Sequence, residues 1–166
     1  LLAPTLTGEF GFSVMQSHLF LLYFAVLSAM TPPVAVAAYA ASAIADANPI
    51  AIAATACKFA VAAFLLPFAF MFAPGILMLD TVPHILMDVA STTLAVVAIS
   101  VAVEGFLRHH IGWPGRLALF FGALALLGPG IDFVAVGLVL TLIGAGLAYR
   151  DHRVPVAVVE RERHIG

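Results

Sequence analysis

An apolar stretch interrupted by two prolines decides the fold: residues 19–45 have the sequence LFLLYFAVLSAMTPPVAVAAYAASAIA. Its first part, residues 19–30, predicts a helix of about 18 Å, shorter than the roughly 30 Å hydrocarbon core of a bilayer. Thr31, Pro32 and Pro33 interrupt this helix before the apolar pattern resumes. A short helix, a break and a second short helix are typical of discontinuous or re-entrant membrane segments.

The composition of the whole chain also indicates a membrane protein. Of its 166 residues, 63% are hydrophobic and 10% are charged, whereas about a quarter of the residues in a soluble domain are charged. The net charge of −2 lacks the basic field that nucleic-acid binding requires. The single cysteine, Cys57, excludes an internal disulfide and every multi-cysteine metal motif. We therefore expect an all-α polytopic protein surrounded by membrane lipid, with no nucleic-acid partner.

Downstream of the break, the sequence predicts an interfacial helix and about three to four transmembrane helices. Asn48 and Pro49 are typical of an N-cap and a first helical position, so residues 48–58 form the interfacial helix. The 21 uncharged residues of 59–79 predict a full span with a kink at Pro67. The later membrane segments are residues 85–107 and a hairpin of residues 117–127 and 131–149.

These segments divide the chain into three predicted parts. Residues 1–79, with a broken helix over 19–45, form one membrane unit, and residues 80–149 form a second. Residues 150–166 form a polar tail. Because no signal-peptide pattern precedes the first apolar segment, we expect the chain to be the C-terminal part of a longer protein.

The basic residues predict the orientation in the membrane. Arg108 and Arg116 precede the last hairpin, and Arg150 and Arg153 follow it. Both groups lie on one side if the hairpin returns across the membrane, and the positive-inside rule makes that side cytoplasmic. Counting backwards also places Lys58 on the cytoplasmic side. We therefore predict a cytoplasmic C-terminus.

The proline break is the candidate ion site. Pro32 and Pro33 have no N–H groups, so the carbonyl oxygens of Ser28 and Ala29 lose their helical donors. Pro32 also disfavours a helical Thr31, which then becomes the N-cap of the next helix. The two carbonyls and the Thr31 hydroxyl would form a small group of neutral oxygens suited to sodium. The alternative is a simple proline kink in a buried helix.

The stretch around this break resembles a known transporter family. The motif T-P-P-V-A-x-A-A-Y-A-A at residues 31–41, the turn with Asp46, Asn48 and Pro49, and the apolar run with Pro67 are similar to the C-terminal part of the large permease subunit of tripartite ATP-independent periplasmic (TRAP) transporters. The similarity covers residues 19–78 and is greatest to fused permeases that work with TAXI-type binding proteins. One departure is Ala35, where many members have Gly.

The resemblance implies a sodium-coupled, elevator-type importer of organic anions in the bacterial inner membrane, with sodium as coupling ion and no other cofactor. Its partners would be a periplasmic substrate-binding protein, the remaining permease segments and a small membrane subunit fused upstream. The competing hypothesis is a membrane scaffold or assembly module that does not transport.

No other residues form a catalytic pattern. Walker, nucleophile-elbow, zinc-protease and dinucleotide-binding motifs are absent from the sequence, so we do not expect an enzyme. His109 and His110 lie beside Trp113, a typical membrane-interface anchor. Asp88 and Glu104 are about 24 Å apart along one predicted helix, too far for a shared acid–base pair. The stripe of Gly137, Thr141, Gly144 and Ala148 predicts a packing face.

Overall fold

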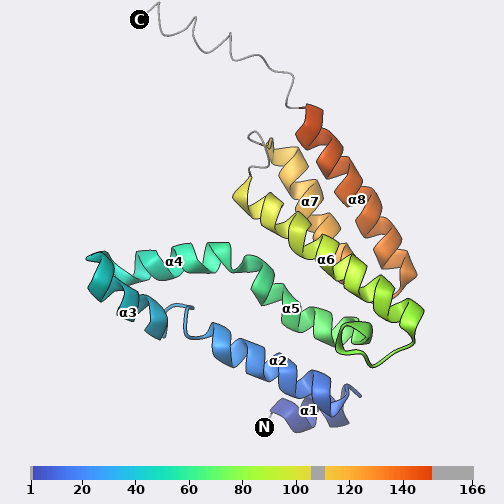
Figure 1. Cartoon of the computed structure of the whole chain (residues 1–166), viewed down its shortest axis with the longest axis horizontal. Coiled ribbons are helices and arrows are strands. Elements are labelled where there is room, and N and C mark those ends of the chain that lie inside the picture. The colour runs from blue at the N-terminus through green and yellow to red at the C-terminus, as the bar shows by residue number, and fades with distance from the viewer. Residues whose placement is uncertain (1, 106–110, 151–166) are drawn as a thin grey trace, which may run out of the picture.

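The computed structural model describes residues 2–105 and 111–150, and all regular structure in those ranges is helical. Two short N-terminal segments, a bent helix pair and a C-terminal bundle follow one another along the chain (Figure 1). The helices are α1 (Leu2–Gly8), α2 (Val14–Leu27), α3 (Val36–Ala45), α4 (Pro49–Phe59), α5 (Val61–Phe72), the 3-10 helix η1 (Pro74–Leu77), α6 (Val82–Glu104), α7 (Trp113–Leu126) and α8 (Ile131–Arg150).

The predicted broken helix is confirmed, because α2 ends at Leu27 and α3 begins at Val36. The chain then turns sharply again, since α3 and α4 form a bent pair with an angle of 118° between them. Asn48 caps α4 as predicted: its Oδ1 accepts hydrogen bonds from the N–H groups of Ile50 at 2.8 Å and Ala51 at 3.4 Å. The re-entrant-like arrangement expected from the sequence is therefore present.

Helix α2 lies beside α5 (Figure 1), and aromatic side chains form the contact between them. Phe20 and Phe24 contact Phe68 edge-on, with ring centroids 5.5 and 5.9 Å apart, and Tyr23 contacts Phe70 at 5.4 Å. Edge-to-face geometry is the favoured arrangement of aromatic pairs and adds to the burial of their apolar surface. These contacts hold the helix before the break against the helix after the bent pair.

The prediction of one continuous span over residues 59–79 was wrong. Helix α5 stops at Phe72, and η1 follows after Ala73. Pro74 has no N–H to donate to the carbonyl of Phe70, and the N–H of Gly75 donates instead to Asp88 Oδ2 at 2.9 Å. The α-helical hydrogen bonds therefore cannot continue past Ala73.

In the described residues, α6 and α8 are long and apolar enough to cross a membrane alone, and the bent α3–α4 pair could count as a third span. Helix α6 begins at Val82, three residues before the predicted segment 85–107, so His84 is helical. Helix α7 begins at Trp113, so Arg116 is helical as well. Both helices start early because a proline occupies the first turn of each, where its missing N–H costs nothing.

Helices α7 and α8 pack closely through glycine. Gly137, Thr141, Gly144 and Ala148 are the buried residues of α8, which confirms the predicted packing face. A Cβ added at Gly144 would lie 2.9 Å from the backbone nitrogen of Leu119, and one added at Gly137 would lie 2.7 Å from that of Leu126. Backbones this close leave no room for a side chain, as in other small-residue helix interfaces in membranes.

We expect Gly144→Ala to destabilise the α7–α8 hairpin by about 1–3 kcal/mol, because the added methyl group forces two backbones apart. The matched control is Gly146→Ala, two residues along the same helix, where an added Cβ meets nothing within 4 Å. Thermal unfolding of the two variants in detergent measures the difference. Equal melting temperatures would contradict the close-packing account.

Candidate functional site

The connection between α2 and α3 contains all five residues of the predicted ion site. Its backbone carbonyls are not free, contrary to expectation. The N–H of Thr31 donates to the carbonyl of Ser28 at 3.2 Å, and the N–H of Ala37 donates to the carbonyl of Ala29 at 2.9 Å. The bond to Ser28 closes a tight local turn, and the chain then folds back far enough for the first turn of α3 to supply the donor to Ala29 that Pro33 lacks. Each oxygen keeps one further lone pair.

Thr31 does not cap α3, which corrects a second expectation. Its hydroxyl donates to the carbonyl of Leu27 at 2.8 Å and so continues the end of α2. The N-cap residue of α3 is Ala35, which has no side-chain cap and a left-handed backbone with φ 36° and ψ 42°. The left-handed residue delays the start of α3 to Val36. The Thr31 hydroxyl oxygen still has acceptor capacity after this donation.

The break is partly covered. Ala29, Thr31 and Pro32 are half-buried, whereas Ser28 and Pro33 are exposed. Cys57 of α4 lies against the same segment, with its Sγ 3.6 Å from the carbonyl oxygen of Met30. The sequence held no signal for this thiol contact, because a lone cysteine on an apolar helix has no pattern to identify it.

A second joint, between α5 and η1, is held by two polar side chains from other helices. Gln16 of α2 donates through Nε2 to the carbonyls of Phe70 at 2.9 Å and Met71 at 3.1 Å. These are the carbonyls that Pro74 and the diverted N–H of Gly75 leave without helical donors. Sequence analysis assigned no role to Gln16. Its capping-box partner Ser13 marked it only as the start of a helix.

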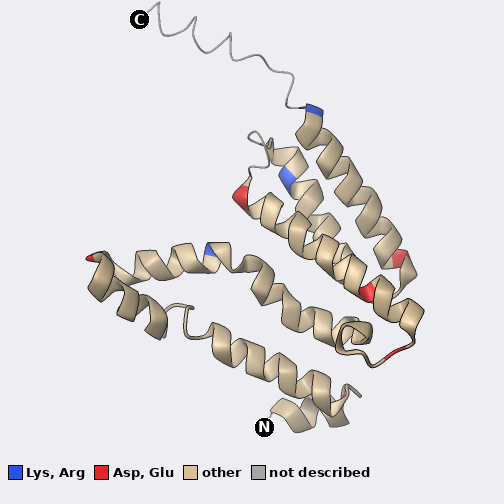
Figure 2. Ribbon diagram, viewed as in Figure 1, with Lys and Arg blue, Asp and Glu red and all other residues tan. Residues whose placement is uncertain are grey.

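Charged side chains gather at opposite ends of the bundle of α6, α7 and α8 (Figure 2). Neighbouring helices run antiparallel: Arg116 at the start of α7 binds the carbonyls of Ala102 and Val103 at the end of α6. Gly115 likewise lies against Gly144 near the end of α8. The basic end therefore carries Arg116 and Arg150 together with Glu104, the last residue of α6, and the other, acidic end carries Asp88 and Asp132 (Figure 2).

The loop before α6 is also acidic. Asp80 accepts a hydrogen bond from the N–H of Thr81 at 2.6 Å and lies 3.1 Å from Nδ1 of His84. The Thr81 bond, followed by the His84 contact, holds the pKa of the Asp80 carboxyl below its usual value. Asp80 is therefore a stable negative charge at the acidic end.

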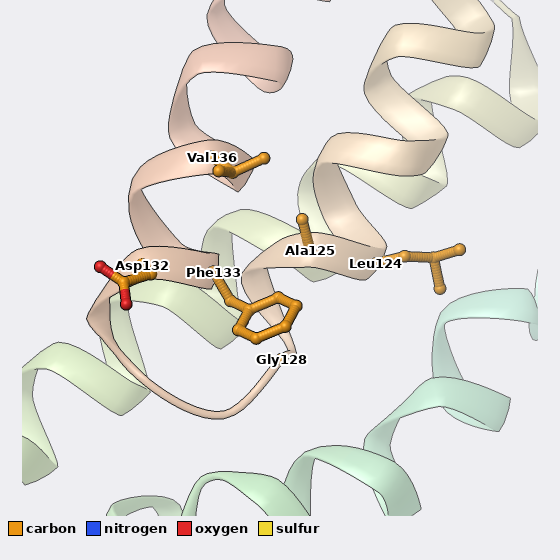
Figure 3. Close-up of a pocket in the computed structure, with 6 residues that line it drawn as sticks. All are labelled: Leu124, Ala125, Gly128, Asp132, Phe133 and Val136. Atoms are coloured by element: carbon orange, nitrogen blue, oxygen red, sulfur yellow. The ribbon is translucent and has the colours of Figure 1, made fainter.

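An apolar pocket of about 440 Å³ lies at the turn between α7 and α8 (Figure 3). Asp132 is the one charged residue of its lining, which also includes Leu124, Ala125, Gly128, Phe133 and Val136. A second cavity, of about 370 Å³, shares Leu124 and Gly128 with it and extends to α5. No described group of three His, Cys, Asp or Glu residues is placed to hold a metal ion. Neither cavity includes a residue of the proline break.

Comparison with protein families decides what kind of protein this is. Residues 1–85 match the model of the tripartite ATP-independent periplasmic transporter, DctM component, and these are 85 of the 166 residues. The chain belongs to the DctM family. Comparison with curated proteins finds no match, and comparison with solved structures finds none.

Family membership makes the protein a permease component of a TRAP transporter and not an enzyme. A DctM component is one part of a complex that also contains a periplasmic binding protein and a DctQ component. The DctM match includes the proline break, the bent α3–α4 pair, α5 and η1, and ends in the first turn of α6. The predicted anchoring role of His109 and His110 concerns residues outside those that the structure describes, as does the tail from Asp151.

We expect Gln16→Leu to lower the free energy of unfolding of the DctM chain by about 1–3 kcal/mol, because it leaves two carbonyls at the α5 end without donors. His18→Leu is the matched control, since His18 is exposed on the same helix and its Nδ1 lies 2.8 Å from the Val14 carbonyl of that helix. Chemical unfolding in mixed micelles compares them. If both variants unfold alike, the Gln16 bonds do not stabilise the joint.

Proposed function

We propose that this DctM chain belongs to a sodium-coupled secondary importer that receives organic anions from a periplasmic binding protein. The observation that carries the proposal is the break between α2 and α3, followed directly by the bent α3–α4 pair. Interrupted helices in secondary transporters bring backbone oxygens and helix ends to ion and substrate sites. Family membership supports a transporter, and sodium coupling is our inference from the chemistry of the break.

The proposed sodium ligands are the carbonyl oxygens of Ser28 and Ala29 and the hydroxyl oxygen of Thr31. Each carbonyl has one N–H donor, which leaves a lone pair for an ion. Pro32 and Pro33 contribute to the site because neither has an N–H group that would compete with an ion for these oxygens. Neutral oxygen ligands suit a hard monovalent cation. Because they add no negative charge to the site, they do not repel an anionic substrate.

We also propose the wider organisation that the sequence suggests. Residues 1–79 would be the end of the transport domain, residues 80–149 a C-terminal membrane extension, and residues 150–166 a cytoplasmic tail. The remaining permease segments and the small membrane subunit would be fused upstream, as in the branch that uses TAXI-type binding proteins. The presence of a helical bundle beyond the family match supports a fused permease with such an extension.

One observation favours the competing hypothesis of a non-transporting scaffold module. Both carbonyls at the break have N–H donors, so the segment satisfies its own hydrogen bonds without an ion. A stable kink of this kind would serve packing alone. Sodium dependence therefore has to be tested at the break itself.

We expect Thr31→Val to raise the sodium concentration needed for half-maximal uptake by the complete transporter, roughly tenfold if one ligand worth about 1.4 kcal/mol is lost. The matched control is Thr55→Val, because Thr55 also donates its hydroxyl to the carbonyl four residues earlier, at 2.9 Å, but is exposed on α4. Initial uptake rates against sodium concentration, at matched expression, provide the measurement. An unchanged curve for Thr31→Val would remove Thr31 from the site.

Replacing Pro32 and Pro33 together by Ala should reduce uptake more severely than Thr31→Val. The restored N–H groups would compete for the carbonyls of Ser28 and Ala29 and straighten the segment. The same uptake assay tests this double variant, with surface expression as the control for insertion. Full activity of the double variant would favour the scaffold hypothesis.

The arrangement of charges supports the predicted cytoplasmic C-terminus. Arg116 and Arg150 lie at one end of the bundle, together with Glu104, and the positive-inside rule, which counts basic residues, makes that end cytoplasmic. A reporter fused to the C-terminus of the complete protein should be active as a cytoplasmic fluorescent fusion and inactive as an alkaline phosphatase fusion. High phosphatase activity would reverse the proposed orientation.

A further inference from the structure

The α3–α4 hairpin is a unit of its own within the fold. Its core consists of Ala35, Ala38 and Ala53, with Ile52 packed against them, and is separate from the main core of the protein. Two joints connect the hairpin to the chain: the proline break before α3, and Ala60, which alone separates α4 from α5. A unit with its own core and a joint at each end can move as a body.

Among the residues that the structure describes, one ion pair joins this hairpin to the C-terminal bundle. Nζ of Lys58, at the end of α4, lies 3.7 Å from Oε2 of Glu104, the last residue of α6. The two side chains are 51% and 49% exposed, so water and salt can reach both charges. Exposed pairs with this geometry are weak and easily opened.

The two partners differ in how much they depend on the pair. Lys58 is in a favourable place without Glu104, because it lies at the negative end of α4 and its Nζ is 5.9 Å from the ring centroid of Phe59. Glu104 is in an unfavourable place, because a carboxylate at a helix C-terminus is repelled by the last carbonyls. Its position therefore costs α6 stability unless a cation is near, and Lys58 and the Arg116 guanidinium are the described cations at this helix end.

Arg116 keeps the end of α6 in place whether or not Lys58 is present. Its guanidinium donates from Nε to the carbonyl of Ala102 at 2.8 Å and from Nη2 to that of Val103 at 3.0 Å. These bonds satisfy two of the free carbonyls at the helix end. Opening the Lys58–Glu104 pair would therefore leave α6 folded.

The other end of α6 is held differently. Asp88 accepts the N–H of Gly75 at 2.9 Å in a close contact, where an added Cβ on Gly75 would lie 2.7 Å from the carboxylate and 2.9 Å from the Cα of Ile85. A bond between a carboxylate and a backbone N–H in such tight packing is stronger than an exposed ion pair. Both contacts cross from the family-matched residues to the helices beyond them.

We propose that Lys58 and Glu104 form a releasable latch between the α3–α4 hairpin and the C-terminal bundle, while Asp88 fastens the opposite end of α6 to η1 permanently. The hairpin turns about Ala60 and the proline break when the latch opens. The bundle outside the family match thereby limits the position of the hairpin. The inference does not depend on sodium coupling.

The test measures the distance between α4 and α6 in the full chain in lipid nanodiscs. Nitroxide labels at Ala54→Cys and Ser100→Cys, both exposed, report this distance by pulsed electron paramagnetic resonance in a Cys57→Ser background. We expect Lys58→Gln and Glu104→Gln each to raise the ratio of long to short distances about two- to fivefold, the range that an exposed ion pair supports. High salt should have the same effect on the parent protein.

Two variants make this result specific to the ion pair. The charge-swapped double variant Lys58→Glu with Glu104→Lys should restore the short distance, and Asp46→Asn, which removes one charge at the exposed tip of the same hairpin, should leave it unchanged. The latch is overturned if the single variants keep the parent distribution or if the swapped variant behaves like them.

Thermal unfolding distinguishes a releasable latch from a contact that stabilises the fold. Glu104→Gln should leave the melting temperature in detergent unchanged, whereas Asp88→Ala should lower it, because the N–H of Gly75 loses its acceptor. An equal loss of stability in both variants would overturn the proposed difference between the two contacts.

Discussion

The absence of water in the hydrocarbon core obliges every backbone N–H and C=O to find a partner within the protein. In this chain the constraint is most severe where helices stop, because prolines and left-handed residues interrupt hydrogen bonding at several points. Each interruption has a particular solution. Ala37 and Thr31 supply N–H groups at the first break, and Gln16 supplies an amide at the end of α5. Arg116 supplies a guanidinium at the end of α6. The irregular segments are thus fixed by long-range polar contacts.

These contacts also order the molecule at a larger scale. Gln16 joins α2 to the end of α5, and Asp88 joins α6 to η1, so the α5–η1 joint is held from both sides. Helix α2 connects this joint to the proposed sodium ligands, because its first turn contacts the α5–η1 joint and its last residue precedes the proline break. The α3–α4 hairpin beyond it has a small core of alanines and only light attachment to the rest. A rigid support next to a loosely held hairpin is a suitable arrangement for a part of a transporter that moves.

The bundle of α6, α7 and α8 relies on a different principle. Its interior is built from small residues, because helices in lipid gain little from hiding apolar side chains and more from close backbone approach. At Gly122, Gly137 and Gly144, an added Cβ would lie within 3 Å of atoms of the neighbouring helix. Such a bundle has little freedom to adjust. In the proposed latch, the bundle is the fixed body that holds the hairpin.

The sequence alone determined the membrane class, the break at Thr31 to Pro33, the Asn48 cap and the glycine face of α8, because these follow from local rules of length, proline geometry and residue size. Its motif also identified the TRAP family. Tertiary structure decided where the freed backbone groups go. The carbonyl of Ala29 looked free because its donor, the N–H of Ala37, comes from a chain reversal that no local pattern encodes. The carbonyl of Ser28 is instead bonded by the N–H of Thr31 in a tight local turn. The span over residues 59–79 stops at Phe72 because Pro74 has no N–H to donate and because Asp88, 13 residues from Gly75 along the chain, accepts the N–H of Gly75. Gln16 has no sequence signal for its role, since its carbonyl partners lie more than 50 residues away.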